Sequence, residues 1–118
     1  MPKRQIKLTT TGRHSGEART VTLYAFDVDD EAMVIVGSRG GAPRHTAWVH
    51  NLRADAHARV AVGQDERSAI AREVSGTERE VLWALVCEAF PLYATYQRRT
   101  TRLIPLFVVE PAPSSSGR

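Results

Sequence analysis

Two short segments near the start of the chain combine glycine with arginine, a pairing that suits the binding of an anion. The first reads Thr10-Thr11-Gly12-Arg13-His14-Ser15-Gly16, and the second reads Gly37-Ser38-Arg39-Gly40-Gly41-Ala42-Pro43-Arg44-His45. Glycine allows positive φ and a close backbone approach to a ligand, and consecutive amides in such turns form concave anion sites. Each segment alone is equally well an ordinary turn, because glycine and serine are common turn residues. Two such segments in one chain favour a shared anionic ligand.

The charge distribution agrees with this interpretation. The net charge of the chain is +3, yet residues 1–19 and 37–53 together carry +7, so the remainder carries −4. Positive potential is therefore expected where the glycines are, which suits a phosphate- or carboxylate-bearing ligand. A solvated basic face would explain the same charges. Nucleic acid is disfavoured as a partner, because no aromatic residue interleaves with the arginines before Trp48 and no recognition-helix pattern is present.

Aromatic residues further along the chain offer a second kind of chemistry. Trp48 could stack on a flat ring, although a large aromatic side chain on an apolar helix face more often belongs to the core. Tyr93 and Tyr96 are three residues apart and would share a helix face. Their hydroxyls could bond a substrate oxygen or deliver a proton, but exposed structural tyrosines would have the same spacing.

Other chemistries find little support. The four histidines and the single cysteine show no zinc-ligand spacing, so no metal site is predicted, and no Gly-x-Ser-x-Gly motif supports a serine nucleophile. Cys87 has no basic neighbour in sequence, and we interpret it as structural. The absence of a signal peptide or a long apolar segment, together with the lone cysteine, predicts a cytoplasmic protein without a membrane span.

The elements that must position these residues are mostly strands. Alternation predicts one strand over residues 19–28 and a buried strand over 32–36, joined as a hairpin. A second pair is expected over 58–62 and 68–74, and a final strand over 106–109 after Pro105. Several short antiparallel strands with one or two helices indicate a small barrel or a strongly curved sheet.

Three helices are expected between these strands. Thr46 is predicted to cap a short helix that carries Trp48, Val49 and Leu52 on one face. Thr77 and Glu80 form a capping-box pattern before a second helix. That second helix is expected to bury Val81, Leu82, Leu85, Val86 and Ala89. Pro91 should end it, and one or two further helical turns are expected over 93–101. Residues 1–111 are predicted to form one domain and residues 112–118 a disordered tail.

Four pieces of the sequence, taken in order, resemble one known family. They are Thr-Thr-Gly-Arg-x-Ser-Gly, Gly-Ser-Arg-Gly-Gly-Ala-Pro-x-His-x-x-Trp-x-x-Asn-Leu, Phe-Pro-x-Tyr-x-x-Tyr-Gln and Ile-Pro-Leu-Phe-Val-Val-Glu-Pro. Together they resemble the deazaflavin-dependent nitroreductase family over residues 9–111. The resemblance implies a mainly β fold, a split β-barrel of the flavin-reductase type with a few packed helices. It also implies coenzyme F420, an 8-hydroxy-5-deazaflavin with a phospholactyl–oligoglutamate tail, and makes FMN a less favoured cofactor.

The resemblance also implies roles for individual residues. Cofactor contacts would come from Arg13, His14, Ser15, Arg19, Gly37, Ser38, Arg39, Trp48 and Asn51. Tyr93 and Tyr96 match tyrosines linked to substrate binding and proton delivery, and we take them as the candidate catalytic residues. His14 stands where relatives often have lysine, and Phe90 stands where a nitro-reducing relative has tyrosine. The resemblance leaves both a homodimer and a monomer open.

The function implied is an F420H2-dependent oxidoreductase. It would transfer a hydride from the reduced deazaflavin to a small electron-poor acceptor, which could be a quinone, an enone or a nitro compound. Two alternatives stay open at this point. One is an FMN-using reductase on the same fold, and the other is a protein that binds or carries F420 without turnover.

Overall fold

A computed structural model describes residues 1–113 of the chain, and six antiparallel strands form its centre. The strands are β1 (Lys3–Thr11), β2 (Ala18–Asp27), β3 (Met33–Val36), β4 (His57–Val62), β5 (Asp65–Glu73) and β6 (Leu106–Pro111). They close into a barrel in the order β1-β2-β3-β6-β5-β4. The predicted mainly β split barrel is therefore confirmed, as are both predicted strand pairs.

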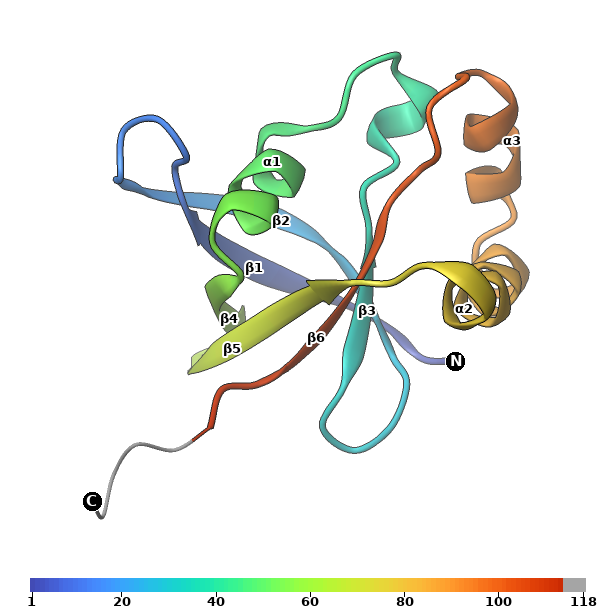
Figure 1. The fold of residues 1–118 in the computed structure, drawn as a ribbon. Helices are drawn as coiled ribbons and strands as arrows, with labels where there is room; N and C mark the ends of the chain where they lie inside the picture. Colours follow the sequence, from blue (N-terminus) through green and yellow to red (C-terminus); the bar gives the residue numbers. More distant parts are fainter. Residues whose placement is uncertain (114–118) are drawn as a thin grey trace.

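Three α-helices and one short 3₁₀ turn complete the fold. They are η1 (Arg39–Gly41), α1 (Ala47–Ala54), α2 (Gly76–Ala89) and α3 (Leu92–Arg98). Figure 1 shows α2 and α3 together on one side of the barrel, whereas α1 lies apart from them, between the β1–β2 hairpin and η1. None of the helices within residues 1–113 is long and apolar enough to cross a bilayer. Residues 114–118, the larger part of the predicted tail, lie outside the described residues.

Two apolar clusters fill the two sides of strands β3 and β6. Ile35, Phe107 and Val109 point into the barrel, where they join Trp48 and other side chains of the inner cluster. Val34, Leu106 and Val108 point outward, lie beneath α2 and α3, and belong to the second cluster, which we call the outer cluster. Successive side chains of a strand face opposite sides, so a strand covered on both sides must be apolar throughout. This explains why residues 33–36 and 106–109 read as continuous apolar runs.

Strand β1 is an element that the sequence analysis missed. Its charged residues suggested a basic terminus, yet Ile6, Leu8 and Thr10 alternate inward and are buried. Strand β1 pairs along its whole length with β2 and also with β4. Because those two pairings close the barrel, this strand is a structural requirement of the fold.

Helix α2 begins earlier than the sequence predicts, and it turns a different face to the barrel. Its N-cap is Ser75, so Thr77 and Glu80 lie inside the helix and the predicted capping box is wrong. Glu78 instead holds the first turn by two bonds to Arg72 of β5, at 2.8 and 2.9 Å.

The buried stripe of α2 is narrower than the predicted apolar face. Leu82 and Val86 are buried, as predicted, but Val81 and Leu85 are 55% and 40% exposed. Ala89 is exposed too. Arg79 takes a buried place on this stripe, where its Nη2 donates to the Ile104 carbonyl at 2.6 Å. The helix therefore covers the sheet along one line of residues rather than across a broad face.

Truncation of single leucines should distinguish the buried face of α2 from its exposed face. Leu82→Ala removes a buried side chain from the outer cluster and should lower the free energy of unfolding by about 2–5 kcal/mol. Leu85→Ala, the matched control on the exposed face, should change it by less than about 0.5 kcal/mol. Urea denaturation followed by circular dichroism measures both. Equal losses for the two variants would contradict this orientation of the helix.

Candidate functional site

The loop between β3 and α1 carries the backbone features that an anion site needs. Ser38 has right-handed helical φ and ψ, and Arg39, Gly40 and Gly41 follow with φ of +45°, +61° and +81°. A right-handed residue followed by a left-handed one orients consecutive amides to the same side, forming a concave nest for an anion. The sequence prediction of a nest-like turn in this segment agrees with this backbone.

A hollow of about 390 Å³ opens beside this loop. Ser38 and Arg39 line it from the loop, Trp48 from α1, and Tyr93 and Tyr96 from α3. Five of the predicted site residues therefore meet at one place, although up to 58 positions separate them in the sequence. A volume of this size lies within the range usual for small-molecule sites.

Four more predicted residues come from the β1–β2 turn and the start of β2, and none of them lines the hollow. Gly16 N donates to Gly12 O at 2.8 Å to close the turn. Ser15 Oγ accepts from the Glu17 amide at 3.1 Å and from Arg19 Nη2 at 3.4 Å. Arg13 Nε donates to Nε2 of its neighbour His14 at 3.0 Å. Arg13, His14, Ser15 and Arg19 are all exposed.

Asn51 and Gly37 are buried, and their contacts fix the backbone segments around the hollow. Asn51 Nδ2 donates to Thr10 Oγ1 at 3.0 Å, and Asn51 Oδ1 accepts from the Arg13 amide at 3.0 Å. The side chain therefore fastens α1 to the β1–β2 turn. At Gly37 an added Cβ would lie 2.7 Å from Val49 and 2.9 Å from Pro105, so only glycine fits there without displacing its neighbours.

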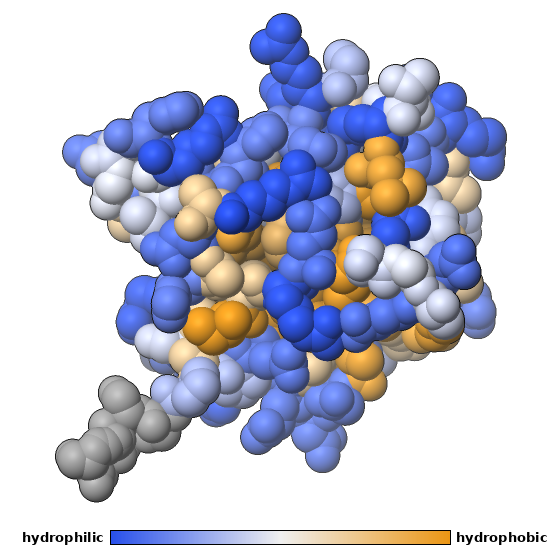
Figure 2. Space-filling view, viewed as in Figure 1, coloured by the Kyte–Doolittle hydropathy of each residue, from blue (hydrophilic) through white to orange (hydrophobic). Residues whose placement is uncertain are grey.

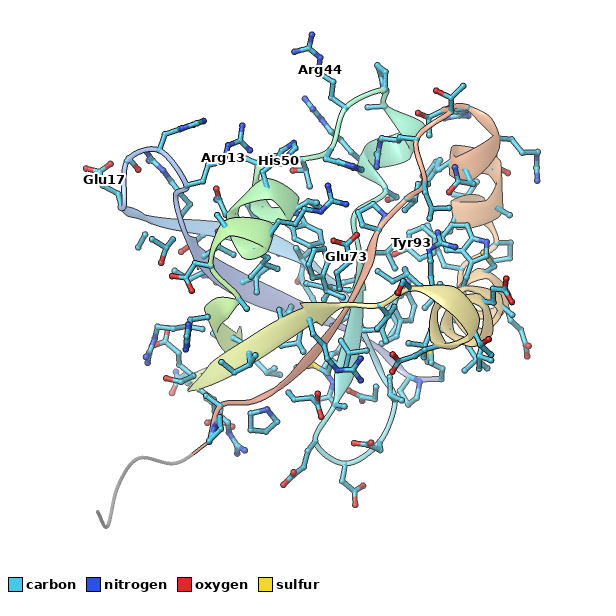
Figure 3. All side chains as sticks on the ribbon, in the orientation of Figure 1. Arg13, Glu17, Arg44, His50, Glu73 and Tyr93 are labelled. Atoms are coloured by element: carbon cyan, nitrogen blue, oxygen red, sulfur yellow. The ribbon has the colours of Figure 1, made fainter. Side chains whose placement is uncertain are left out.

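Two histidines near these arginines, His45 and His50, have a lowered pKa, which favours the neutral imidazole. Burial, followed by the charges of Arg53 and Arg102, lowers the pKa of His45. Burial and the charges of Arg13 and Arg53 lower the pKa of His50 in the same way. Figure 3 shows Arg13 and His50 next to each other at the edge of α1, with Arg44 pointing outward from the preceding loop. The effect of these arginines on both imidazoles agrees with the positive potential that the sequence predicts here.

Tyr93 stands at the opposite wall among aromatic rings. It is 6% exposed, and its ring centroid lies 4.8 Å from that of Phe90, 5.9 Å from Phe26 and 6.3 Å from Tyr96. Burial raises the pKa of Tyr93 to about 12. Its hydroxyl is therefore a neutral hydrogen-bond donor throughout the physiological range.

Part of the wall comes from residues that the sequence pattern does not single out. Thr22 and Tyr24 of β2 also line the hollow, from one face of the strand. Trp48 reaches the hollow, but it also packs edge-on against Phe107 of the inner cluster at 5.7 Å, so the core and site interpretations both apply. Cys87 is half-buried on α2 and does not line the hollow, and burial raises the pKa of its thiol.

A second hollow, of about 620 Å³, lies at the other end of β3 and is the larger of the two. None of the predicted site residues lines it. Its rim is mostly acidic, with Asp27, Asp29, Asp30, Glu31, Asp65 and Glu110 against Arg4 and Arg67. This sign repels an anionic ligand, so we take the smaller hollow as the candidate functional site despite its size.

Titration should identify Tyr93 by its high pKa. Tyr93 should ionise late, at about pH 12, and Tyr93→Phe should remove that late step. The neutral form is favoured in the folded protein, so the free energy of unfolding should fall as pH rises from about 10 to about 12. Absorbance of tyrosinate in the ultraviolet measures this. A late step that persists in the variant would contradict the assignment.

Comparisons with known proteins agree on one family. A model of the F420H(2)-dependent quinone reductase family matches residues 1–111. An F420H(2)-dependent quinone reductase of Mycobacterium tuberculosis is 39% identical over 106 residues, which cover 86% of this chain and 70% of the relative.

Solved structures show the same likeness. One described as an F420-H2 dependent reductase is 41% identical and superposes with a TM-score of 0.79, covering 90% of this chain and 93% of the other. A second, described as a domain-swapped dimer, is also 41% identical with a TM-score of 0.80, covering 90% of this chain and 79% of the other.

Proposed function

The chain belongs to the F420H(2)-dependent quinone reductase family and is an oxidoreductase that uses coenzyme F420, and on this premise we propose how its residues divide the work. The basic residues around the β1–β2 turn and η1 bind the anionic tail of the cofactor. The hollow lined by Trp48, Tyr93 and Tyr96 receives the ring and a quinone. The observation that carries the proposal is the meeting of Arg39 and the two tyrosines at one hollow.

The residues of the hollow fit a deazaflavin. One wall is polar and cationic, from Ser38, Arg39 and Thr46, and the other is aromatic, from Phe90 and the tyrosines. A tricyclic ring with polar edges needs such an amphipathic slot, and the phosphate and glutamates of the tail need cations outside it. Arg13 and Arg19 are exposed. The Arg13 amide is bonded to Asn51 of α1, the helix that carries Trp48 to the hollow, so a tail that leaves the hollow along α1 would meet both arginines.

The chain itself supplies position and hydrogen bonds. Bound F420H2 supplies a hydride from C5 of the deazaflavin. Tyr93, neutral because of its high pKa, can donate a hydrogen bond to an oxygen in the hollow but is a weak acid. Within residues 1–113 no hydrogen bond occupies the hydroxyl of Tyr93 or Tyr96. Such a donor polarises a quinone carbonyl as negative charge develops on its oxygen, and water or Tyr96 can deliver the proton.

Quinones are the acceptor that the family and the wall of the hollow favour. The family name specifies quinone, whereas the sequence resemblance left enones and nitro compounds open as well. Phe90 contributes an apolar ring to the hollow where a nitro-reducing relative has a hydroxyl. An apolar wall suits the flat ring of a quinone, which carries polar atoms only at its two carbonyls.

Two finer points remain proposals. We propose a cytoplasmic location, supported by the single, half-buried cysteine. We also propose that the chain can pair with a second copy, supported by the solved relative that is described as a domain-swapped dimer. Light scattering of the purified protein measures the second point directly.

Removal of the Arg39 charge should weaken cofactor binding. Arg39→Ala is expected to raise the Kd for F420 at least about tenfold, because a charge-assisted hydrogen bond contributes on the order of 1.5–3 kcal/mol. Arg67→Ala, which removes an exposed arginine at the other hollow, is the matched control and should bind F420 as the wild type does. Fluorescence titration of F420 gives each Kd, with FMN titrated in parallel. Binding of FMN in preference to F420 would refute the proposal.

Removal of the Tyr93 hydroxyl should slow turnover instead. Tyr93→Phe is expected to lower kcat with a small quinone roughly tenfold or more, while the Kd for F420 changes by less than about twofold. The appearance of oxidised F420 at 420 nm follows the reaction, and Tyr96→Phe in parallel shows which hydroxyl matters more. A wild-type protein that binds F420 but does not accelerate the oxidation of F420H2 by quinones would favour the carrier function.

A further inference from the structure

Arg102, between α3 and β6, makes an unusual set of bonds to the loop of residues 37–42. Its Nε donates to Ala42 O at 2.8 Å, its Nη1 to Gly37 O at 3.1 Å and its Nη2 to Ser38 O at 2.7 Å. Nη1 also lies 2.9 Å from Nδ1 of His45. One half-buried side chain thus reaches three carbonyls of one loop and a ring just beyond it.

The loop needs such support because its backbone is strained. Arg39, with φ of +45°, is the only non-glycine residue with positive φ among the described residues. The left-handed conformation is unfavourable for residues that carry a Cβ and persists where the surroundings enforce it. The loop supplies two backbone bonds of its own, Gly41 N to Ser38 O at 2.9 Å and Ala42 N to Arg39 O at 3.0 Å.

Arg102 holds this strained turn at both ends. Gly37 and Ser38 precede Arg39, and Ala42 follows the last residue of η1. The three carbonyls turn toward the guanidinium, and a carbonyl fixed in this way fixes the peptide plane to which it belongs. The peptide that joins Ser38 to Arg39 is among those held. The direction in which the Arg39 side chain leaves the loop is therefore set by Arg102.

The same arrangement joins the loop to the helix of the two tyrosines. An added Cβ on Gly41 would lie 2.5 Å from the carbonyl oxygen of Tyr96 and 2.9 Å from Cβ of Arg99. The loop thus rests directly on α3, and Arg102 leaves the chain four residues after that helix ends at Arg98. The two walls of the hollow, loop and helix, are fixed to each other at this point.

The guanidinium has little capacity left for a ligand. Arginine has five N–H donors, and four contacts already use donors of all three nitrogens of Arg102. Arg102 is also absent from the wall of the hollow. The cation therefore acts on the loop and not on an anion in the site.

We propose that Arg102 is a positioning residue that clamps the 37–42 loop, so that Ser38 and Arg39 face the cofactor, without touching the cofactor itself. The part of the inference that concerns affinity rests on the proposed F420 function. The part that concerns the loop holds for the protein alone. Lysine cannot replace Arg102, because an ammonium is a single point of donation and cannot span three separated carbonyls.

A double-mutant cycle on F420 affinity tests the positioning role. Arg102→Lys should raise the Kd for F420 about tenfold in the wild-type background. In the Arg39→Ala background it should raise the Kd by clearly less than tenfold, because Ser38 is then the only one left of the two residues that it positions. Arg98 is an exposed arginine on α3 whose Nη2 donates to Thr95 Oγ1, and Arg98→Lys is the control that should leave the Kd unchanged. A wild-type Kd in Arg102→Lys, or a full tenfold effect that persists without Arg39, would overturn the proposal.

Amide hydrogen exchange of the cofactor-free protein gives an independent readout. Arg102→Lys should speed exchange at the Gly41 and Ala42 amides at least tenfold, while exchange in the β1–β2 pairing stays as in the wild type. Unchanged exchange in the loop would refute the clamp even if the protein binds no F420. Failure of the wild type to bind F420 would refute the proposed function and leave the exchange comparison valid. If the lysine variant does not fold, Arg102→Gln, which keeps two N–H donors, takes its place in both measurements.

Discussion

The closed barrel depends on strands β3 and β6 being covered on both faces. These two strands are neighbours in the barrel, with the barrel interior on one side and the helices α2 and α3 on the other. On the face seen in Figure 2, apolar residues emerge in separate patches between polar ones. Strand β3 leads directly into the 37–42 loop, and β6 directly follows the Arg102 segment. Burial of this strand pair therefore also positions Arg102 and the loop that it bonds. The site is therefore built on the most deeply buried pairing of the fold.

Part of this fold could be predicted from the sequence, because in some segments the hydrophobic pattern matches the burial in the structure. The runs at 33–36 and 106–109 are apolar on both faces, and the short helix with Trp48 and Leu52 on one side is amphipathic. Strand β1 escaped detection because its outward positions are Lys3, Lys7 and other polar residues. On α2, exposed Val81 and Leu85 imitate a core face, while the buried stripe includes Arg79. Hydropathy cannot reveal a buried arginine whose partner is a backbone carbonyl.

The candidate site was readable to the extent that side chains alone define it. Arg39, Trp48 and Tyr93 could be singled out because cations and aromatic rings have recognisable chemistry, and the structure brings them to one hollow. Arg102 gave no such signal, because its partners are the carbonyls of Gly37, Ser38 and Ala42, which every residue type possesses. Thr22 and Tyr24 were hidden for a related reason, since only the closure of the barrel turns that face of β2 toward α3.

The acidic rim at the far end of β3 has a consequence for how ligands arrive. Arg39 lines one hollow, whereas six carboxylates outnumber two arginines around the other, so opposite charge is concentrated at the two ends of β3. A polyanion approaching from solution experiences a torque as well as an attraction, so that encounters are biased toward the basic end before any contact forms. Dissolved ions screen such fields over about 8 Å at physiological ionic strength. The rate of association, more than the lifetime of the complex, should therefore vary with salt.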